Sequence, residues 1–150
     1  MLIRVTDAIL DVNEAIDAVR RDSAGAVNVF LGVVRNMNKG RDVAYLEYEA
    51  YAPMAEKVML EIAEEAKEQF GLEDCAVLHR TGRLEIGETS LLVALSSGHR
   101  PESFDGGRWM VDEIKKRVPV WKKEVWSDGE EWIEGPESLG VRQAGSPAGS

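Results

Sequence analysis

Hydrophobic residues recur along the chain at helical spacing in three places. The clearest run follows Pro53, where an apolar residue recurs every four positions until Gly71 and glutamates occupy the other side, which is typical of an amphipathic helix. A shorter helix is predicted near residues 12–22, with Asp11 as its N-terminal cap. A third helix is predicted at about 102–118, with Phe104 facing inward and Pro119 ending the helix.

Runs of β-branched or alternating residues predict the strands between these helices. Residues 26–34 are expected to form a buried strand, and residues 43–51 alternate between apolar and polar positions. A polar loop at residues 35–40 separates these two segments, which favours an antiparallel pair. Further strands are predicted at residues 2–5 (at a sheet edge), 75–80, 84–86, 90–97, 120–126 and 131–133.

This order of elements predicts an α+β (mixed α/β) fold in one domain of residues 1–135. Residues 136–150 are rich in Gly, Ser, Ala and Pro and show no periodicity, so they are predicted to form a disordered tail.

Composition narrows the class of protein. The 150 residues carry 27 acidic and 18 basic side chains, a formal net charge of −9, which disfavours binding to nucleic acid or to an anionic membrane. The single cysteine, Cys75, cannot form an internal disulfide, and with two histidines the chain is not expected to hold a metal or another cofactor. Because no apolar run approaches a membrane span and the N-terminus lacks signal-peptide features, the cytoplasm is the expected compartment.

One basic segment stands out against this acidic background. Residues 114–123 (IKKRVPVWKK) hold five basic side chains and no acidic one. Pro119 stiffens the turn between Lys115 and Lys122, so both amines could face one pocket and act on an anionic substrate or as acid, base or nucleophile. The alternative is a solvated helix end whose charges complement the helix dipole.

Three other cationic positions are candidates for anion binding. His99 and Arg100 lie between an apolar strand and a helix, and Arg35 follows the strand predicted at residues 26–34. A capping histidine and an exposed turn arginine are the alternatives at these positions. For His79 and Arg80, inside a predicted strand, a structural role is favoured, and Cys75 is expected to be a buried core residue.

Several short segments are weak signals one by one, but together and in this order they are specific for one protein family. They are FLGVVRN (30–36), LEYEAY (46–51), HRTG (79–82), SGHR (97–100), KKRVPVWKKE (115–124), Asp128-Gly129 and Trp132. Together, over about residues 3–134, they resemble the large, catalytic subunit of molybdopterin synthase. Gly98 departs from the family pattern, in which Ala is more usual.

The resemblance implies an α/β hammerhead fold with an additional antiparallel β subdomain. It also implies a sulfurtransferase that converts cyclic pyranopterin monophosphate (precursor Z) into the dithiolene of molybdopterin. The sulfur would come from a thiocarboxylate on the C-terminal Gly-Gly of a small ubiquitin-like sulfur-carrier subunit. The implied assembly is a heterotetramer built on a homodimer of large subunits.

The resemblance also implies which residues form the site. Lys115 and Lys122 match the family's active-site lysines, and Arg35, His99 and Arg100 match its substrate-pocket residues. Positions that line the same pocket are matched by Val33, Val34, Lys123 and Glu124. Two other functions stay open from the residues themselves: a phosphoester hydrolase for a nucleotide-like substrate, and a non-catalytic module that binds an acidic partner.

Overall fold

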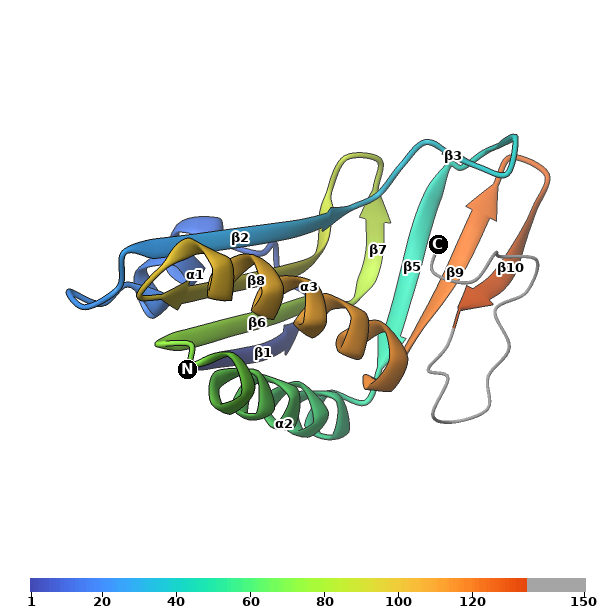
Figure 1. The fold of residues 1–150 in the computed structure, drawn as a ribbon. Helices are drawn as coiled ribbons and strands as arrows, with labels where there is room; N and C mark the ends of the chain where they lie inside the picture. The colour runs from blue at the N-terminus through green and yellow to red at the C-terminus, as the bar shows by residue number, and fades with distance from the viewer. Residues whose placement is uncertain (135–150) are drawn as a thin grey trace.

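Two four-stranded sheets and three helices form the described part of the chain, residues 1–134 of a computed structural model (Figure 1). The helices are α1 (Val12–Val19), α2 (Ala52–Phe70) and α3 (Arg100–Arg117). None of these three helices is both long and apolar enough to cross a membrane. The tail predicted at residues 136–150 lies outside the described residues.

The first sheet has the order β1-β6-β8-β2, in which β1 runs parallel to β6 and the other pairs are antiparallel. The second sheet has the order β10-β9-β5-β7 and is antiparallel throughout. A short hairpin of β3 and β4 stands apart. In chain order the strands are β1 (Leu2–Thr6), β2 (Ala26–Val33), β3 (Met37–Asn38), β4 (Arg41–Asp42), β5 (Tyr45–Ala50), β6 (Asp74–Arg80), β7 (Gly82–Glu85), β8 (Thr89–Ser97), β9 (Val120–Trp126) and β10 (Gly129–Glu134).

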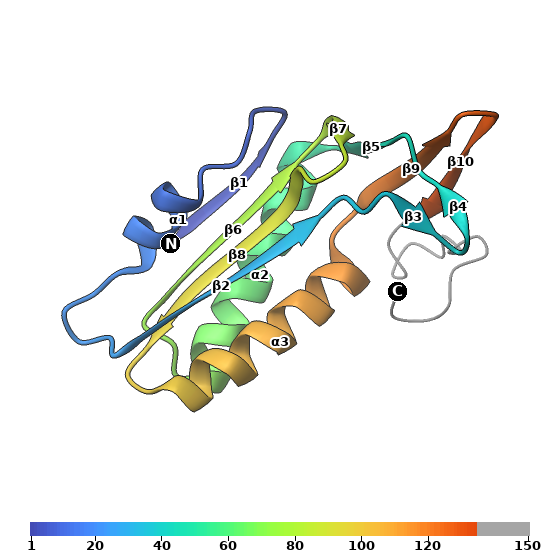
Figure 2. The same cartoon turned by 90° about the horizontal axis from the view of Figure 1, so that it is seen from above.

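The first sheet is covered on both faces, which explains the almost continuous apolar run of β8. Helices α2 and α3 lie on one face and α1 on the other (Figure 2). Along β8, Val93 and Leu95 pack toward α2 and α3, whereas Leu92 and Ala94 pack toward α1. This mixed α/β fold with an added antiparallel sheet confirms the predicted fold class.

The helix ends follow the signals in the sequence. Asp11 caps α1 and accepts hydrogen bonds from the backbone N–H groups of the second and third helical residues. Helix α1 ends at Val19, earlier than predicted, because Arg20 adopts an extended backbone. Gly71 ends α2 in the left-handed conformation, with φ +67°. Helix α3 ends two residues before Pro119.

Three predictions about the strands and their packing are wrong. Strand β2 is not buried: it is an edge strand, and Phe30 and Leu31 are exposed. It pairs with β8 rather than with residues 43–51, because the chain between them folds into the β3–β4 hairpin and leads β5 into the second sheet. Phe104 points outward from α3 with 64% of its surface exposed.

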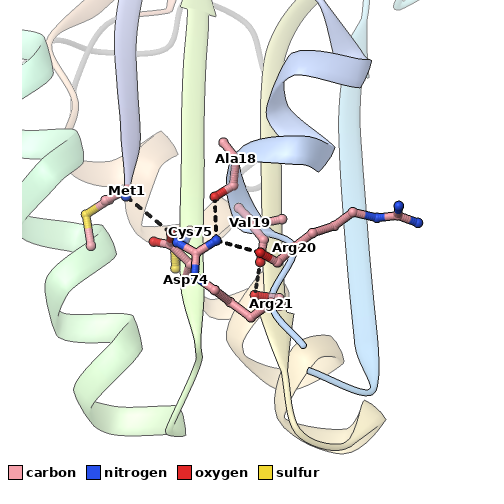
Figure 3. Close-up of polar contacts among 8 residues, drawn as sticks. Met1, Ala18, Val19, Arg20, Arg21, Asp74 and Cys75 are labelled. Carbon is pink, nitrogen blue, oxygen red and sulfur yellow. Dashed lines mark hydrogen bonds and ion pairs between the residues drawn. The ribbon is translucent and has the colours of Figure 1, made fainter. Parts of the chain in front are cut away.

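A buried carboxylate ties the start of the first sheet to α1. Asp74, at the start of β6, accepts hydrogen bonds from the N-terminal ammonium of Met1 at 3.2 Å and from the backbone N–H of Cys75 at 2.8 Å (Figure 3). The Arg21 guanidinium pairs with the same carboxylate and also donates to two carbonyl groups at the end of α1. Charged hydrogen bonds offset the cost of burying the Asp74 charge. Cys75 is buried, as predicted.

Two glycines meet where β2 begins and β8 ends. A Cβ atom added at Gly25 would lie 2.5 Å from the carbonyl oxygen of Gly98, whereas one added at Gly98 would meet nothing within 4 Å. The close approach is between backbone atoms, so neither partner can rotate away.

We expect Gly25→Ala to lower the free energy of unfolding by about 1–3 kcal/mol, because the backbone must shift. The matched variant Gly98→Ala should change it by less than about 0.5 kcal/mol. Urea unfolding of both variants checks this contrast. Equal losses in the two variants would show that the Gly25 contact does not limit the fold.

Candidate functional site

Lys115 and Lys122 come together because the chain changes direction between them. Lys115 is in the last turn of α3, and Lys122 is near the start of β9. Val118 donates its backbone N–H to the carbonyl of Ile114 at 3.0 Å and then adopts an extended backbone. Pro119 has no N–H to continue the helix, so the chain enters β9 at once.

Both lysines line a hollow between the two sheets, which we call the lysine cleft. Its inner part has a volume of about 90 Å³ and its outer part about 350 Å³. The outer volume lies within the usual range for small-molecule sites. Five of the lining residues are shared by the two parts: Gly32, Tyr48, Ser90, Lys115 and Lys122.

The end of β2 forms one wall of the lysine cleft. The register of β2 against β8 shifts between Gly32 and Val33, and Ser90 donates its hydroxyl to the carbonyl of Gly32 at 3.2 Å. Such an irregularity redirects the following side chains. Val33 and Arg35 line the outer part, whereas Val34 is buried in the core of the second sheet and anchors this wall.

Glu124 forms the opposite wall and is almost fully buried. One carboxylate oxygen accepts a hydrogen bond from the Trp126 indole N–H at 2.5 Å, and the other accepts one from the Asn38 side-chain amide at 2.9 Å. The Arg41 guanidinium stacks over the Trp126 ring at 3.9 Å from its centroid. These contacts attach the β3–β4 hairpin to β9 beside the lysine cleft.

The lysine cleft is a cationic site in an acidic protein. Among the described residues, Arg35, Lys115 and Lys122 are the basic side chains that line its outer part, and Glu124 is the acidic one. A concave surface with this excess of positive charge favours anionic ligands. Within residues 1–134, no three His, Cys, Asp or Glu side chains lie close enough together to hold a metal ion.

Lys123 lies outside the lysine cleft. Neighbouring residues of a strand point to opposite faces, so Lys123 faces away from the side occupied by Lys122. Its ammonium pairs with Glu47 at 2.9 Å and with Glu130 at 3.7 Å. The hydrogen bond to Glu47 raises the pKa of Lys123 above its usual value and stabilises the charged form.

His99 and Arg100 are also distant from the lysines of the same chain. His99 occupies the N-cap position of α3 without a capping hydrogen bond from its side chain, and Arg100 is the first residue of the helix, whereas Lys115 is in the last turn. Fifteen helical steps separate Arg100 from Lys115, a distance of about 22 Å along the axis. Within one chain, therefore, the structure brings together Arg35, Lys115, Lys122, Val33 and Glu124 but not His99 or Arg100.

Three polar residues that line the inner part of the lysine cleft were not among the predicted site residues: Tyr48, Ser90 and His79. The alternation of residues 43–51 placed Tyr48 on a strand face, but no sequence pattern shows which sheet that face meets. His79 was noted in the sequence as part of a His-Arg pair, but its position inside a predicted strand favoured a structural role. Ser90 had no signal of its own.

Comparisons with known proteins show which family the chain matches. The family described as MoaE protein matches residues 5–117. A molybdopterin synthase catalytic subunit from Pyrococcus abyssi is 48% identical over 133 residues, which cover 89% of this chain and 90% of the relative. The crystal structure of molybdopterin synthase from Staphylococcus aureus matches with a TM-score of 0.85 at 37% identity, over 88% of this chain and 96% of that one.

A more distant match shows the fold alone. It is a protein–protein complex of subunits 1 and 2 of the molybdopterin-converting factor from Helicobacter pylori, with a TM-score of 0.71 at 20% identity. The matching region covers 87% of this chain and 89% of that one.

Proposed function

The chain belongs to the MoaE protein family, and from this premise we propose that it is the catalytic subunit of a molybdopterin synthase, an enzyme of molybdenum cofactor biosynthesis. In the proposed reaction, sulfur passes from the C-terminal thiocarboxylate of a small ubiquitin-like subunit to cyclic pyranopterin monophosphate and forms the dithiolene. The observation that carries this proposal is the lysine cleft, where Arg35, Lys115 and Lys122 line one hollow. We expect the reaction to occur in the cytoplasm.

The charges of the reactants explain why such a cleft is needed. The pterin carries a cyclic phosphate and the incoming tail carries a thiocarboxylate, so two anions must approach each other. Their repulsion grows as water is displaced from the site. Fixed cations offset that repulsion without having to reorganise during the reaction. The excess of basic over acidic side chains in the outer part supports this role.

The position and chemistry of each cation support a division of roles. Arg35 carries a planar guanidinium that can hold a phosphate through two hydrogen bonds, so we assign it to the pterin phosphate. Lys115 and Lys122 line both the inner and the outer parts. We assign Lys115 to proton transfer at the reacting carbons, and Lys122 to orienting the thiocarboxylate and stabilising developing negative charge.

Lys115→Ala should lower the rate of dithiolene formation by about 10²–10⁴-fold, because a group that acts in the transition state is lost. Binding of the small subunit should stay close to normal, since α3 and β9 keep their positions. The measurement is dithiolene formation in a reconstituted reaction, with subunit binding followed separately.

Lys116→Ala provides the matched control. Lys116 is the next residue of the same helix, is 59% exposed and pairs with Glu113 at 3.5 Å, outside the lysine cleft. This variant should keep near-normal turnover. The assignment of Lys115 is wrong if both variants retain activity or if both lose it equally.

The positions of His99 and Arg100 support a homodimer in which each copy completes the site of the other. Strand β2 pairs on one side only among residues 1–134, and Phe30 and Leu31 are exposed along it. Beside it, β2 and α3 enclose an apolar hollow of about 310 Å³ that is lined by the exposed Phe104. A surface of this kind can pair with its own copy about a two-fold axis.

A two-fold axis across this surface would reverse the direction of α3 in the second copy. The start of one α3 would then lie near the end of the other, so His99 and Arg100 of each copy could reach the lysine cleft of its partner. We propose that they help to hold the pterin phosphate there. One small subunit bound to each large subunit would complete a heterotetramer.

Mixing two inactive variants tests this arrangement. If Lys115 and Arg100 act in the same site from different chains, equal amounts of Lys115→Ala and Arg100→Ala chains, refolded together, should recover about a quarter of the wild-type activity. Half of the dimers would then be mixed, and each mixed dimer would hold one intact site. If both residues acted within one chain, no site would be intact and no activity would return.

A further inference from the structure

His79 is a buried histidine on the wall of the lysine cleft. It lies near the end of β6, has 7% of its surface exposed and lines the inner part together with Lys115 and Lys122. The proposed reaction assigns it no role, although a strand end beside two lysines is an unusual place for a buried imidazole.

The backbone fixes which nitrogen of His79 carries the proton. Nδ1 lies 2.9 Å from the carbonyl oxygen of Arg80. A carbonyl oxygen only accepts hydrogen bonds, so Nδ1 must be the donor. In a neutral imidazole the other nitrogen, Nε2, is then unprotonated and is an acceptor.

The surroundings keep this ring neutral. The pKa of His79 is lowered to about 4, mainly by burial and in smaller part by the nearby charge of Lys115, while the hydrogen bond to the Arg80 carbonyl acts in the opposite direction. The ring of Tyr48 meets the imidazole edge to face, with 5.2 Å between centroids and 66° between planes. The titratable groups that share the inner part with His79 are Tyr48 from β5, Lys115 from α3 and Lys122 from β9.

We propose that His79 is a positioning residue for the sulfur transfer described above: its Nε2 accepts a hydrogen bond from the Lys115 ammonium and directs that group toward the reacting anions. This inference rests on the proposed function. Two fixed contacts hold the imidazole, the Nδ1 hydrogen bond and the Tyr48 ring, so Nε2 is a rigid acceptor in the part of the cleft that Lys115 and Lys122 also line.

Two substitutions of His79 distinguish a role for Nδ1 from a role for Nε2. The amide of His79→Asn reaches about as far as Nδ1 and can still donate to the Arg80 carbonyl, but it leaves nothing at Nε2. The longer amide of His79→Gln reaches about as far as Nε2 and can accept there. A purely structural role at Nδ1 therefore favours Asn, whereas a role for Nε2 favours Gln.

In the reconstituted reaction, His79→Asn should lower kcat by about ten- to a hundredfold with less than about a threefold change in KM. His79→Gln should restore most of the activity. Equal activity of the two variants, or better activity of Asn, would overturn the proposal.

Nuclear magnetic resonance of the wild-type chain gives a readout that needs no substitution and no reaction. Long-range proton–nitrogen correlations should show Nδ1 protonated and Nε2 unprotonated from about pH 5.5 to 8.5. A proton on Nε2, or titration of His79 inside that range, would overturn the proposal. Failure of the sulfur transfer itself would appear instead as an inactive wild-type protein.

Discussion

The turn at Pro119 is the constraint on which the site depends. It ends α3, and within one residue the chain becomes the strand that pairs with β5 in the second sheet. Figure 1 shows that this turn leads from α3, beside the first sheet, into β9 of the second sheet. Residues on both sides of the turn line the lysine cleft. Lys115 and Lys122 lie on either side of this turn, so one of the covalent connections between the two sheets also brings the two amines together.

The five basic residues of 114–123 have different surroundings, so only some of their charges face a ligand. Arg117 pairs with Glu65 at 2.7 Å, and Lys123 pairs with Glu47 at 2.9 Å. These ion pairs lie near the surface and are each worth little. Lys115 and Lys122 instead line the lysine cleft. The acidic surface thus neutralises much of the basic segment, and the positive charge that faces a ligand is concentrated in one hollow.

Local patterns predicted local structure well and tertiary structure poorly. The four-residue spacing after Pro53, the glycine at position 71 and Pro119 identified two helices and their ends, because each signal acts through its own backbone. The pairing of β2 with β8 depends on contacts more than fifty residues apart, and no local pattern records it. For the same reason the sequence indicated Lys115 and Lys122 as a pair but could not place His79 beside them.

In the proposed reaction, the lysine cleft is the place where a thiocarboxylate gives its sulfur to a pterin phosphate. The most direct measurement is the mass of the small subunit after incubation with this chain, with and without cyclic pyranopterin monophosphate. We expect the C-terminal thiocarboxylate to become a carboxylate only when both the chain and the pterin are present, with two carriers consumed for each dithiolene formed. A carrier that keeps its sulfur, or loses it without any change in the pterin, would show that this chain does not transfer sulfur to the pterin.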